Sequence, residues 1–399
     1  MGMKPSPFGT QIPYEEKELK VVGSNPEARP DAVDKVTGKA RYAADINLPG
    51  QLIGKVLRSP HAHARIKSID ASEAEKLKGV KAVICRDDLP DMPVMHAAAG
   101  EIMVNFRDVT RTIMAREKAL FDGHPVAAVA ATSESIAKAA LKLIKVEYEV
   151  LPHVIDVVDA MKPDAPLLHE DQITKGVEPV PEKPSNIAAQ MVSKLGDIEE
   201  GFEQADLVVE REFNTKAAHQ GYIEPHASLA IYTEGGNAEV WTSTQGHFLI
   251  RAQIAEILEM DVSRVKVTPA ELGGGFGGKN MIYLEPLAIV LSKKSGRPVK
   301  MVMTRDEVFR ASGPTSGTNI IIKIGITKGG RITAAQAILN YQSGCFPGSS
   351  LPLCTPTAFT RYDIANVLVI GNDVTCNRPK VTAYRSPGAP MIAFGVETV

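Results

Sequence analysis

Apolar and polar residues alternate along the first part of the chain in periods that predict short strands and one helix. Runs that fit buried or half-buried strands occupy residues 52–58, 82–85, 126–130 and 145–150. Ser133 fits a helix N-cap, because its hydroxyl can accept a hydrogen bond from the first helical turn. The helix that follows would bury one face, made of Ile136, Ala139, Ala140 and Leu143.

The second half of the chain also predicts a mixture of strands and helices. Strands are predicted at Asp206–Phe213, Ala227–Tyr232, Glu239–Ser243 and Arg264–Val267. Helices are predicted at His247–Leu258, Ile282–Lys294 and Met391–Val399. The first of these helices would bury a face of Phe248, Ile250, Ile254, Ile257 and Leu258. A hairpin is predicted from Asn319–Ile326 and Arg331–Asn340, turning at Lys328-Gly329-Gly330.

A length of 399 residues exceeds what one compact core normally organises, so we expect more than one domain. Residues 1–30 are polar and carry several prolines, which indicates an arm. Residues 31–155 predict a first domain and residues 186–399 a second. Prolines and acids mark residues 156–185 as a linker, although an ordered strap over the surface fits the same composition. The predicted fold class is α+β, with strands and helices mixed in both domains (mixed α/β).

Composition and charge argue against several classes of partner. Lysine and arginine total 45 against 47 for aspartate and glutamate, so we expect neither nucleic acid nor an anionic membrane as the main partner. The first residues lack a basic region followed by an apolar run, and no stretch is apolar enough to span a bilayer. The cysteines at positions 85, 345, 354 and 376 show no CxxC spacing, which argues against a zinc or iron–sulfur site in this chain. These features predict a cytoplasmic protein.

The segment Gly273–Lys279 (GGGFGGK), called the glycine loop below, matches two nucleotide-binding patterns, and each match is incomplete. A P-loop needs Ser or Thr after the lysine to hold magnesium, and Asn280 stands there. A dinucleotide-binding loop needs an acid about 20 residues further on, where this chain has Val299–Met303. The glycines would still let the backbone approach a ligand closely, with loop and helix N–H groups facing an anion or oxo group and Phe276 as a wall. A glycine hinge is the simpler alternative.

Two further segments carry side chains suited to a polar ligand. Gln245 ends a predicted strand and can donate a hydrogen bond to a buried oxo group, although a turn glutamine that is already satisfied is the simpler interpretation. Arg385 precedes a rigid Ser-Pro-Gly turn and can fork onto a phosphate or a pterin; alone, it would be a surface arginine.

Histidines give weaker indications. His61 and His63 would share one face of a strand, a spacing that can bind a metal, but the sequence places no third ligand near them. A denser cluster runs from His219 to His226 (HQGYIEPH), in which Glu224 stands before proline at the entry to a strand. This position favours a structural anchor over a site role.

Five segments, taken in order, resemble the molybdopterin-binding subunit of the xanthine dehydrogenase, aldehyde oxidase and carbon monoxide dehydrogenase family. They are Asp34–Ile66 (with DKVTGKARY and RSPHAHARI), His219–Pro225, Ser243–Gln245, Gly273–Lys279 and Ala383–Gly388 (AYRSPG). The resemblance covers most of the chain. It implies a "hammerhead" α/β domain at residues 31–155 and the first half of the molybdopterin-binding domain at residues 186–399.

The same resemblance implies a set of cofactor contacts. The residues expected to contact molybdopterin are Gln245, Gly275, Phe276, Gly277 and Arg385, with Gln245 on the oxo side of the molybdenum and Arg385 on the pterin. The pterin holds the metal, so we expect no metal ligand from the protein. The cofactor would be the cytosine dinucleotide form, and electrons would leave through [2Fe–2S] and FAD groups on partner subunits.

Departures from the family pattern narrow the expected substrate, which would meet Asn280, Leu353 and Pro387. Purine-oxidising members carry Glu after the loop lysine and Arg upstream of the AYR motif, where this chain has Asn280 and Leu353. They also follow the motif arginine with Gly-Phe, where this chain has Ser386-Pro387. Carbon monoxide enzymes have Cys at the position of Ser386. We therefore expect an N-heteroaromatic compound, an aldehyde or an aromatic acyl thioester.

The family's general base is a glutamate in a Gly-Glu segment near the end of a longer chain, and no residue here fits that role. We expect no catalytic residue in this chain and a base on a second molybdopterin-domain subunit, as in nicotinate dehydrogenase-type enzymes. A truncated gene is the alternative. The enzyme would then be a heteromultimeric hydroxylase. The competing functions are a cofactor-binding or assembly subunit without turnover and, less favoured, a P-loop-like nucleotide-binding protein.

Overall fold

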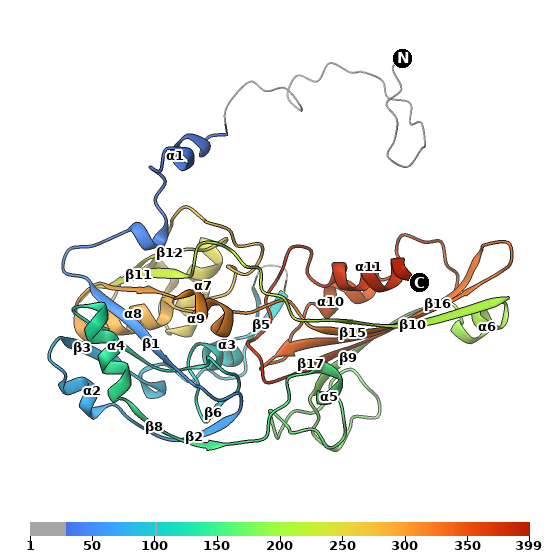
Figure 1. Ribbon diagram of the computed structural model, residues 1–399, viewed down its shortest axis with the longest axis horizontal. Coiled ribbons are helices and arrows are strands. Elements are labelled where there is room, and N and C mark those ends of the chain that lie inside the picture. Colours follow the sequence, from blue (N-terminus) through green and yellow to red (C-terminus); the bar gives the residue numbers. More distant parts are fainter. Residues whose placement is uncertain (1–28, 100–101) are drawn as a thin grey trace, which may run out of the picture. The chain divides into compact units, whose positions relative to one another are not determined.

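The computed structural model describes residues 29–99 and 102–399, and the chain divides into two units, residues 1–41 and 42–399. The described part of the first unit forms one short helix, α1 (Ala32–Val36). The predicted arm lies almost wholly outside the described residues. The described part of the second unit contains four β-sheets with helices around them (Figure 1).

The largest sheet has seven strands in the order β13-β12-β11-β14-β1-β7-β3. Its strands are β1 (Leu52–Arg58), β3 (Val80–Ile84), β7 (Pro125–Ala131), β11 (Ala227–Tyr232), β12 (Ala238–Thr242), β13 (Val265–Pro269) and β14 (Val299–Val302). The predicted strands at residues 52–58 and 227–232 are confirmed at both ends. Because β1 pairs in parallel with β14, the sheet joins strands from both sides of the boundary proposed near residue 155. The domain boundary near residue 155 stays a prediction, and the seven-stranded sheet continues across it.

Helices pack on both faces of this sheet. The helices of the second unit are α2 (Ser72–Lys76), α3 (Phe106–Ile113), α4 (Glu134–Leu143), α5 (Val157–Ala160), α6 (Ile198–Glu203), α7 (His247–Ile257), α8 (Glu285–Ser295), α9 (Arg305–Ala311), α10 (Leu351–Cys354) and α11 (Ala389–Thr398). Every residue of β7 is buried, because Ala127 and Val129 pack with α4 while Ala128 and Ala130 pack with the core that contains α8. Alternate side chains of a strand point to opposite faces, so small residues suit a strand covered on both.

Two predicted helix faces need correction. Ser133 caps α4 as predicted, accepting a hydrogen bond from the Ile136 N–H. The buried face of α4 is Ala137 and Ala140, however, while Ala139 and Leu143 are exposed. In α7, Ile250, Ile254 and Ile257 are fully buried as predicted, but Phe248 is 71% exposed. The periodicity therefore placed both helices correctly, and it was wrong about Ala139 and Leu143 in α4 and about Phe248 in α7.

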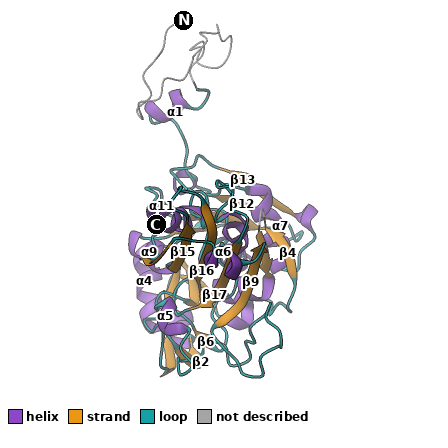
Figure 2. Cartoon of the chain, turned by 90° about the vertical axis from the view of Figure 1, so that its right-hand side faces the viewer, coloured by secondary structure: helices purple, strands orange, loops and turns teal. Residues whose placement is uncertain are grey.

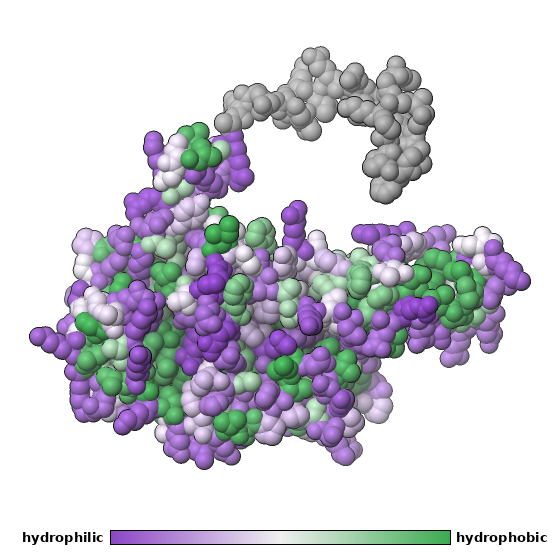
Figure 3. Space-filling view, viewed as in Figure 1, coloured by the Kyte–Doolittle hydropathy of each residue, from purple (hydrophilic) through white to green (hydrophobic). Residues whose placement is uncertain are grey.

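The second sheet has five strands in the order β10-β15-β16-β17-β9 (Figure 2). They are β9 (Ile187–Leu195), β10 (Leu207–Thr215), β15 (Thr318–Ile326), β16 (Ile332–Gly344) and β17 (Val367–Thr375). The predicted hairpin is confirmed as β15 and β16. One face packs on α10 and α11, through Ile320 and Ile322 against Ile392 and Val396. Figure 3 shows apolar residues gathered toward its right-hand side. Leu207 and Val208 of the edge strand β10 are exposed apolar residues.

A row of amide side chains crosses the opposite face of the five-stranded sheet. Asn340 donates to Asn319 at 2.9 Å, Asn372 donates to Asn340 at 2.7 Å, and Gln190 donates to Asn372 at 3.0 Å. These residues are also directly paired across the strands, so each bond joins neighbours in register. A one-residue slip would place every amide on the other face, so the row fixes the register.

Smaller elements complete the second unit. A three-stranded sheet contains β2 (Ala64–Asp70), β6 (Lys118–Ala119) and β8 (Lys145–Val150), and a two-stranded sheet contains β4 (His96–Ala99) and β5 (Ile102–Asn105). His61 and His63 precede β2 in a bent loop, so the prediction that they share a strand face is wrong. The His63 Nδ1 lies 2.7 Å from the Pro152 carbonyl oxygen, a bond to the backbone.

The segment at residues 156–185 is packed against the rest of the unit. Its Leu168 is fully buried with Val374, and Asn186 donates to the carbonyls of Ala160 and Pro166. These contacts favour the ordered strap over the free linker. No helix in the described part of the chain has the length and apolar character needed to cross a membrane.

Candidate functional site

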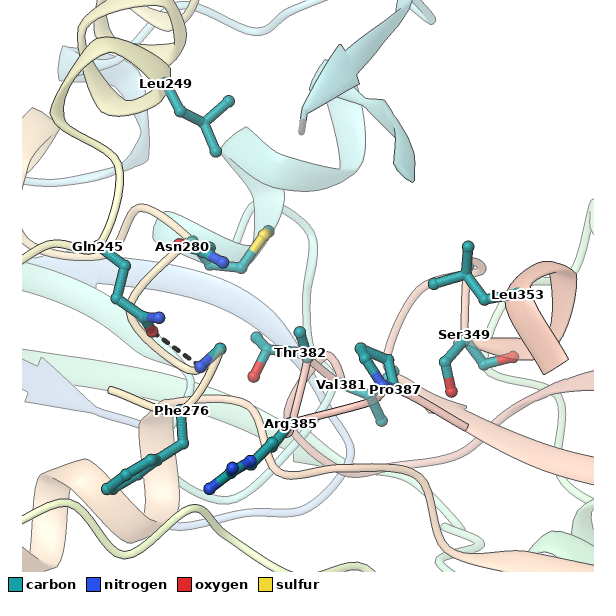
Figure 4. Close-up of a pocket in the computed structure, with 15 residues that line it drawn as sticks. Gln245, Leu249, Phe276, Asn280, Ser349, Leu353, Val381, Thr382, Arg385 and Pro387 are labelled. Carbon is teal, nitrogen blue, oxygen red and sulfur yellow. Dashed lines mark hydrogen bonds between the residues drawn. The ribbon is translucent and has the colours of Figure 1, made fainter. Parts of the chain in front are cut away.

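A cavity of about 490 Å³ lies at the ends of strands from both large sheets. Four segments line it: Gln245–Leu249 after β12, Phe276–Met281 before α8, Gly348–Leu353 after β16, and Val381–Pro387 before α11. Strands β12 and β13 are parallel, so the segments that follow them emerge at the same sheet edge. The predicted site residues that line the cavity are Gln245, Phe276, Gly277, Asn280, Leu353, Arg385 and Pro387 (Figure 4).

Gln245 lies against the glycine loop and is held by it. Its Oε1 accepts hydrogen bonds from the N–H groups of Gly277, at 2.8 Å, and Lys279, at 3.3 Å. Gly275, the remaining predicted residue, lies behind this contact: a Cβ there would stand 2.4 Å from that oxygen, so only glycine permits the approach. The interpretation of a satisfied turn glutamine is therefore right for the oxygen. The amide nitrogen has no partner among the described residues, and it remains a donor toward the cavity.

The second half of the glycine loop uses its backbone N–H groups within the protein. The N–H groups of Gly277, Gly278 and Lys279 are all taken, by Gln245 or by the Gly275 carbonyl. Helix α8 begins only at Glu285, and the carboxylate of that residue accepts the N–H groups of the two residues before it. The expectation that the helix start faces an anion is therefore wrong.

Lys279 points into the protein. Its side chain is fully buried, and its Nζ lies 2.7 Å from a carboxylate oxygen of Glu224 and 4.8 Å from the centre of the Tyr222 ring. A P-loop lysine must reach the phosphates of a nucleotide. Because this lysine is sealed in an ion pair on the other side of the loop, the structure contradicts the P-loop alternative. Glu224 is the structural anchor that its position before proline predicted.

The glycine loop touches the segment Val381–Pro387, called the arginine segment below. The Arg385 N–H donates to the Phe276 carbonyl at 2.8 Å, and a Cβ on Gly277 would lie 2.6 Å from the Ala383 carbonyl oxygen. Phe276 and Ser386 adopt positive φ angles of 52° and 59°, which side-chain-bearing residues seldom do. Strained backbone of this kind persists where the surroundings enforce it, commonly at functional sites.

The Arg385 guanidinium is exposed and has no partner among the described residues. Figure 4 shows it beside the Phe276 ring, which is itself 49% exposed. Arg385 is the one charged residue among those described as lining the cavity, and the same lining contains no carboxylate. A lone arginine fork above an uncharged pocket suits an anionic or multiply hydrogen-bonding ligand.

The cavity is also lined by residues that the sequence did not single out. They are Leu249 and Met281 on the side of Gln245, Gly348, Ser349 and Ser350 on the far wall, and Val381 and Thr382 in the arginine segment. The loop with Ser349 is held by Asp373, whose carboxylate accepts from the N–H groups of Gly348, at 2.7 Å, and Ser349, at 2.9 Å. Met281 and Thr382 lie beside predicted residues and were within reach of the motif argument. Ser349 and Ser350 stand in a plain turn sequence, which carries no such signal.

Comparison with known proteins adds the family. The sequence-family model of the molybdopterin cofactor-binding domain matches residues 180–399. The sequence-family model of the aldehyde oxidase and xanthine dehydrogenase a/b hammerhead domain matches residues 37–152. The chain belongs to the molybdopterin-binding subunits of this family. It is 31% identical to a probable xanthine dehydrogenase subunit of Bacillus subtilis over 95% of this chain and 48% of that one. It is 30% identical to the nicotinate dehydrogenase large molybdopterin subunit of Eubacterium barkeri over 94% of this chain and 83% of that one.

Solved structures of the family share the fold. The aldehyde oxidoreductase of Desulfovibrio desulfuricans superposes with a TM-score of 0.79 at 26% identity, covering 92% of this chain and 40% of that chain. The chain thus spans about half the length of most of the curated relatives it matches, and a larger share of the Eubacterium subunit. Membership also accounts for the two incomplete nucleotide patterns: in this family member, the glycine loop is the support of Gln245.

Proposed function

We propose that this chain is the molybdopterin-binding subunit of a multi-subunit molybdenum hydroxylase, which oxidises a carbon of its substrate with oxygen from water. One observation carries the proposal: a single cavity unites Gln245, the glycine loop and Arg385, which come from distant parts of the sequence. The family's cofactor would supply the redox and oxygen-transfer chemistry. This chain's residues would bind it, orient it and shape the space around it.

The residues present fit such a group. The Gln245 Nε2 offers a hydrogen-bond donor whose direction is fixed by the two bonds to its oxygen. Gly275 and Gly277 leave a surface without side chains, Phe276 covers it, and the Arg385 guanidinium offers a fork for the pterin or phosphate part. Among the described residues, no Asp, Glu, Cys or His lines the cavity, which agrees with a metal held by the cofactor and not by this part of the chain.

The substrate would enter between Asn280, Leu353 and Pro387, which meet in the same cavity. Leu353 and Pro387 are apolar and Asn280 is uncharged, so the walls favour a flat, weakly polar molecule such as an N-heteroaromatic compound, an aromatic acyl thioester or an aldehyde. A purine would not find charged partners at positions 280 and 353, at a cost of roughly 1–3 kcal/mol for each lost pairing.

The base and the electron path would come from other chains. We propose a second molybdopterin-domain subunit with the catalytic glutamate, a [2Fe–2S] subunit and an FAD subunit, with the cofactor in its cytosine dinucleotide form. The free cysteines Cys85, Cys345, Cys354 and Cys376 suit a reducing compartment, and we place the complex in the cytoplasm.

Two variants of Gln245 separate its structural role in holding the glycine loop from its proposed role as a donor to the cofactor. Gln245→Glu keeps an oxygen for the Gly277 and Lys279 N–H groups but removes the donor, whereas Gln245→Ala removes both. We expect Gln245→Glu to retain thermal stability and molybdenum content and to lose turnover by about 10²–10³-fold, as when one preorganised donor is removed. Gln245→Ala should lose stability as well. A wild-type complex that turns over without molybdenum and pterin would overturn the proposal, and one that holds both but never turns over would favour the assembly subunit.

A further inference from the structure

The irregular segment Gln220–Glu224 lies beneath both loops that the proposed function places against the cofactor. Three of its side chains are buried: Tyr222 is 1% exposed, Gln220 5% and Glu224 8%. None of them lines the cavity. Burying polar groups has a cost that hydrogen bonds offset, so the partners of these side chains show what the segment holds. The second oxygen of Glu224 and the amide oxygen of Gln220 are buried without a partner among the described residues.

Glu224 holds the first turn of the glycine loop from two directions. Its N–H donates to the Gly273 carbonyl at 3.1 Å, and its Oε2 accepts from the Gly273 N–H at 2.8 Å. The same oxygen accepts from the Lys279 Nζ at 2.7 Å. One carboxylate oxygen thus ties the first and the last residue of the glycine loop together. The loop is closed from below, on the side away from Gln245.

Gln220 holds the arginine segment. Its Nε2 donates to the Ala383 carbonyl at 2.8 Å and to the Thr382 hydroxyl at 3.0 Å. Its amide carbon also presses on the glycine loop, because a Cβ on Gly278 would lie 2.8 Å from it. Tyr222 lies between these two anchors, with its Cβ close to Gly274 and its ring close to Gly278. Its hydroxyl is bonded to His226 at 2.6 Å and to Ser312 at 3.1 Å.

We propose that Gln220 and Glu224 are positioning residues that set the separation between Gln245 and Arg385, Glu224 acting through Lys279 and the glycine loop, and Gln220 through Ala383. The part of this inference that concerns catalysis rests on the proposed function, whereas the part that concerns loop geometry does not. On this view, the loop lysine is an internal tie that keeps the cofactor-facing surface in shape.

Amide hydrogen exchange of the purified complex tests the geometry, and matched variants separate position from general stability. Gln220→Met removes the two bonds to the arginine segment. Gln172→Met is its control, because the Gln172 Nε2 makes the same kinds of bond, to the Ser185 carbonyl and the Thr375 hydroxyl, outside the cavity. We expect Gln220→Met to raise exchange about tenfold or more in residues 273–280 and 381–387. Gln172→Met should leave both stretches unchanged.

The ion pair is tested by rescue. Lys279→Met leaves a buried carboxylate without its partner, and it should lower both the exchange protection of the loop and the molybdenum content. The double variant Glu224→Gln/Lys279→Met keeps an acceptor for the Gly273 N–H without a buried charge, and it should recover most of both. Lys300→Met is the control, since Lys300 is also buried but bonds Asn47 beside the seven-stranded sheet. It should lower stability and leave loop exchange as in the wild type.

Two further measurements distinguish a positioning role from a merely structural one. They are the Mo(V) EPR spectrum and the separate effects of a variant on KM and on kcat, which a structural role would leave unchanged at full molybdenum content. We expect Gln220→Met to shift the spectrum and lower kcat at full molybdenum content. Loop exchange equal to that of the matched controls, or an unchanged spectrum, would overturn the positioning role. A wild-type complex without molybdenum whose loops still respond as expected would overturn the proposed function and leave the geometric part standing.

Discussion

Gly277→Ala is the sharpest probe of how closely the two loops of the cavity approach each other. Gly277 has a φ of +103°, and a Cβ added there would lie 2.6 Å from the Ala383 carbonyl oxygen and 2.8 Å from the Ala383 Cβ. Two distinct costs follow. One is the backbone conformation, which alanine seldom adopts, and the other is overlap with the backbone of the arginine segment.

The magnitude follows from these two costs. The positive φ costs about 1–2 kcal/mol for a residue with a Cβ. The overlap costs about 1–3 kcal/mol, because the neighbour is backbone and cannot rotate away. If the arginine segment withdraws to relieve the overlap, the 2.8 Å bond from the Arg385 N–H to Phe276 breaks, and this loss is part of the same cost. We therefore expect Gly277→Ala to reduce the free energy of unfolding by roughly 2–5 kcal/mol.

The free energy of unfolding is measured by urea denaturation, and substitutions at two other glycines separate the backbone cost from the overlap cost. Gly330 has a φ of +81° with nothing within 4 Å, so Gly330→Ala reports the backbone cost alone. Gly235 has no left-handed φ, and its Cβ would meet its nearest neighbour at 3.5 Å, so Gly235→Ala should be nearly neutral. A loss for Gly277→Ala within about 1 kcal/mol of that for Gly330→Ala would refute the argument from close approach. The molybdenum content of the Gly277→Ala complex should fall as the loops separate.

Two further predictions concern the fold around the site. Burial lowers the pKa of His124 to about 4, below its ordinary 6.5, so the unfolded chain binds the proton first as the pH falls. The contribution of neutral His124 to the free energy of unfolding is complete above pH 6.5 and is lost between pH 6.5 and about 4, by roughly 3 kcal/mol. His124→Gln should therefore flatten the pH dependence of the measured free energy of unfolding in that window. In the amide row, Asn340→Ala removes partners from both Asn319 and Asn372 and should cost about 2–4 kcal/mol in urea denaturation, whereas Gln190→Ala at the end of the row should cost about half as much. Equal losses for the two variants would contradict a connected row.

The elements with clear local signals were predictable from the sequence. Ser133 and the residues after it specify a helix start, because a hydroxyl at that position satisfies an N–H that the helix leaves free. The hairpin at residues 328–330 follows from its glycines. Strands without such signals were missed: β17 contains Gly371, Asn372 and Asp373, which disfavour strands locally and are accepted because β16 and β9 pair with it on both sides.

The order of five short segments was enough to predict the family and to gather seven cavity residues before any geometry was known. Such motifs persist as strings of residues, so a single sequence can reveal them. The far wall, with Ser349 and Ser350, could not be predicted in this way. Its residues lie there because Asp373 holds their loop by a contact across about 24 positions of the chain. The turn sequence itself has an ordinary composition.

What the sequence by itself determined is the set of chemical groups: a glycine loop, one glutamine and one arginine, in the order typical of a molybdopterin subunit. What only the tertiary structure decided is the direction in which each group points. The sequence allowed Lys279 to face a phosphate, Gln245 to be an idle turn residue and the loop N–H groups to face a ligand. Folding turned Lys279 inward to Glu224 and directed the N–H groups of Gly277 and Lys279 to Gln245. The physical reason is that buried polar groups must find partners, and those partners lie on segments far away in the chain.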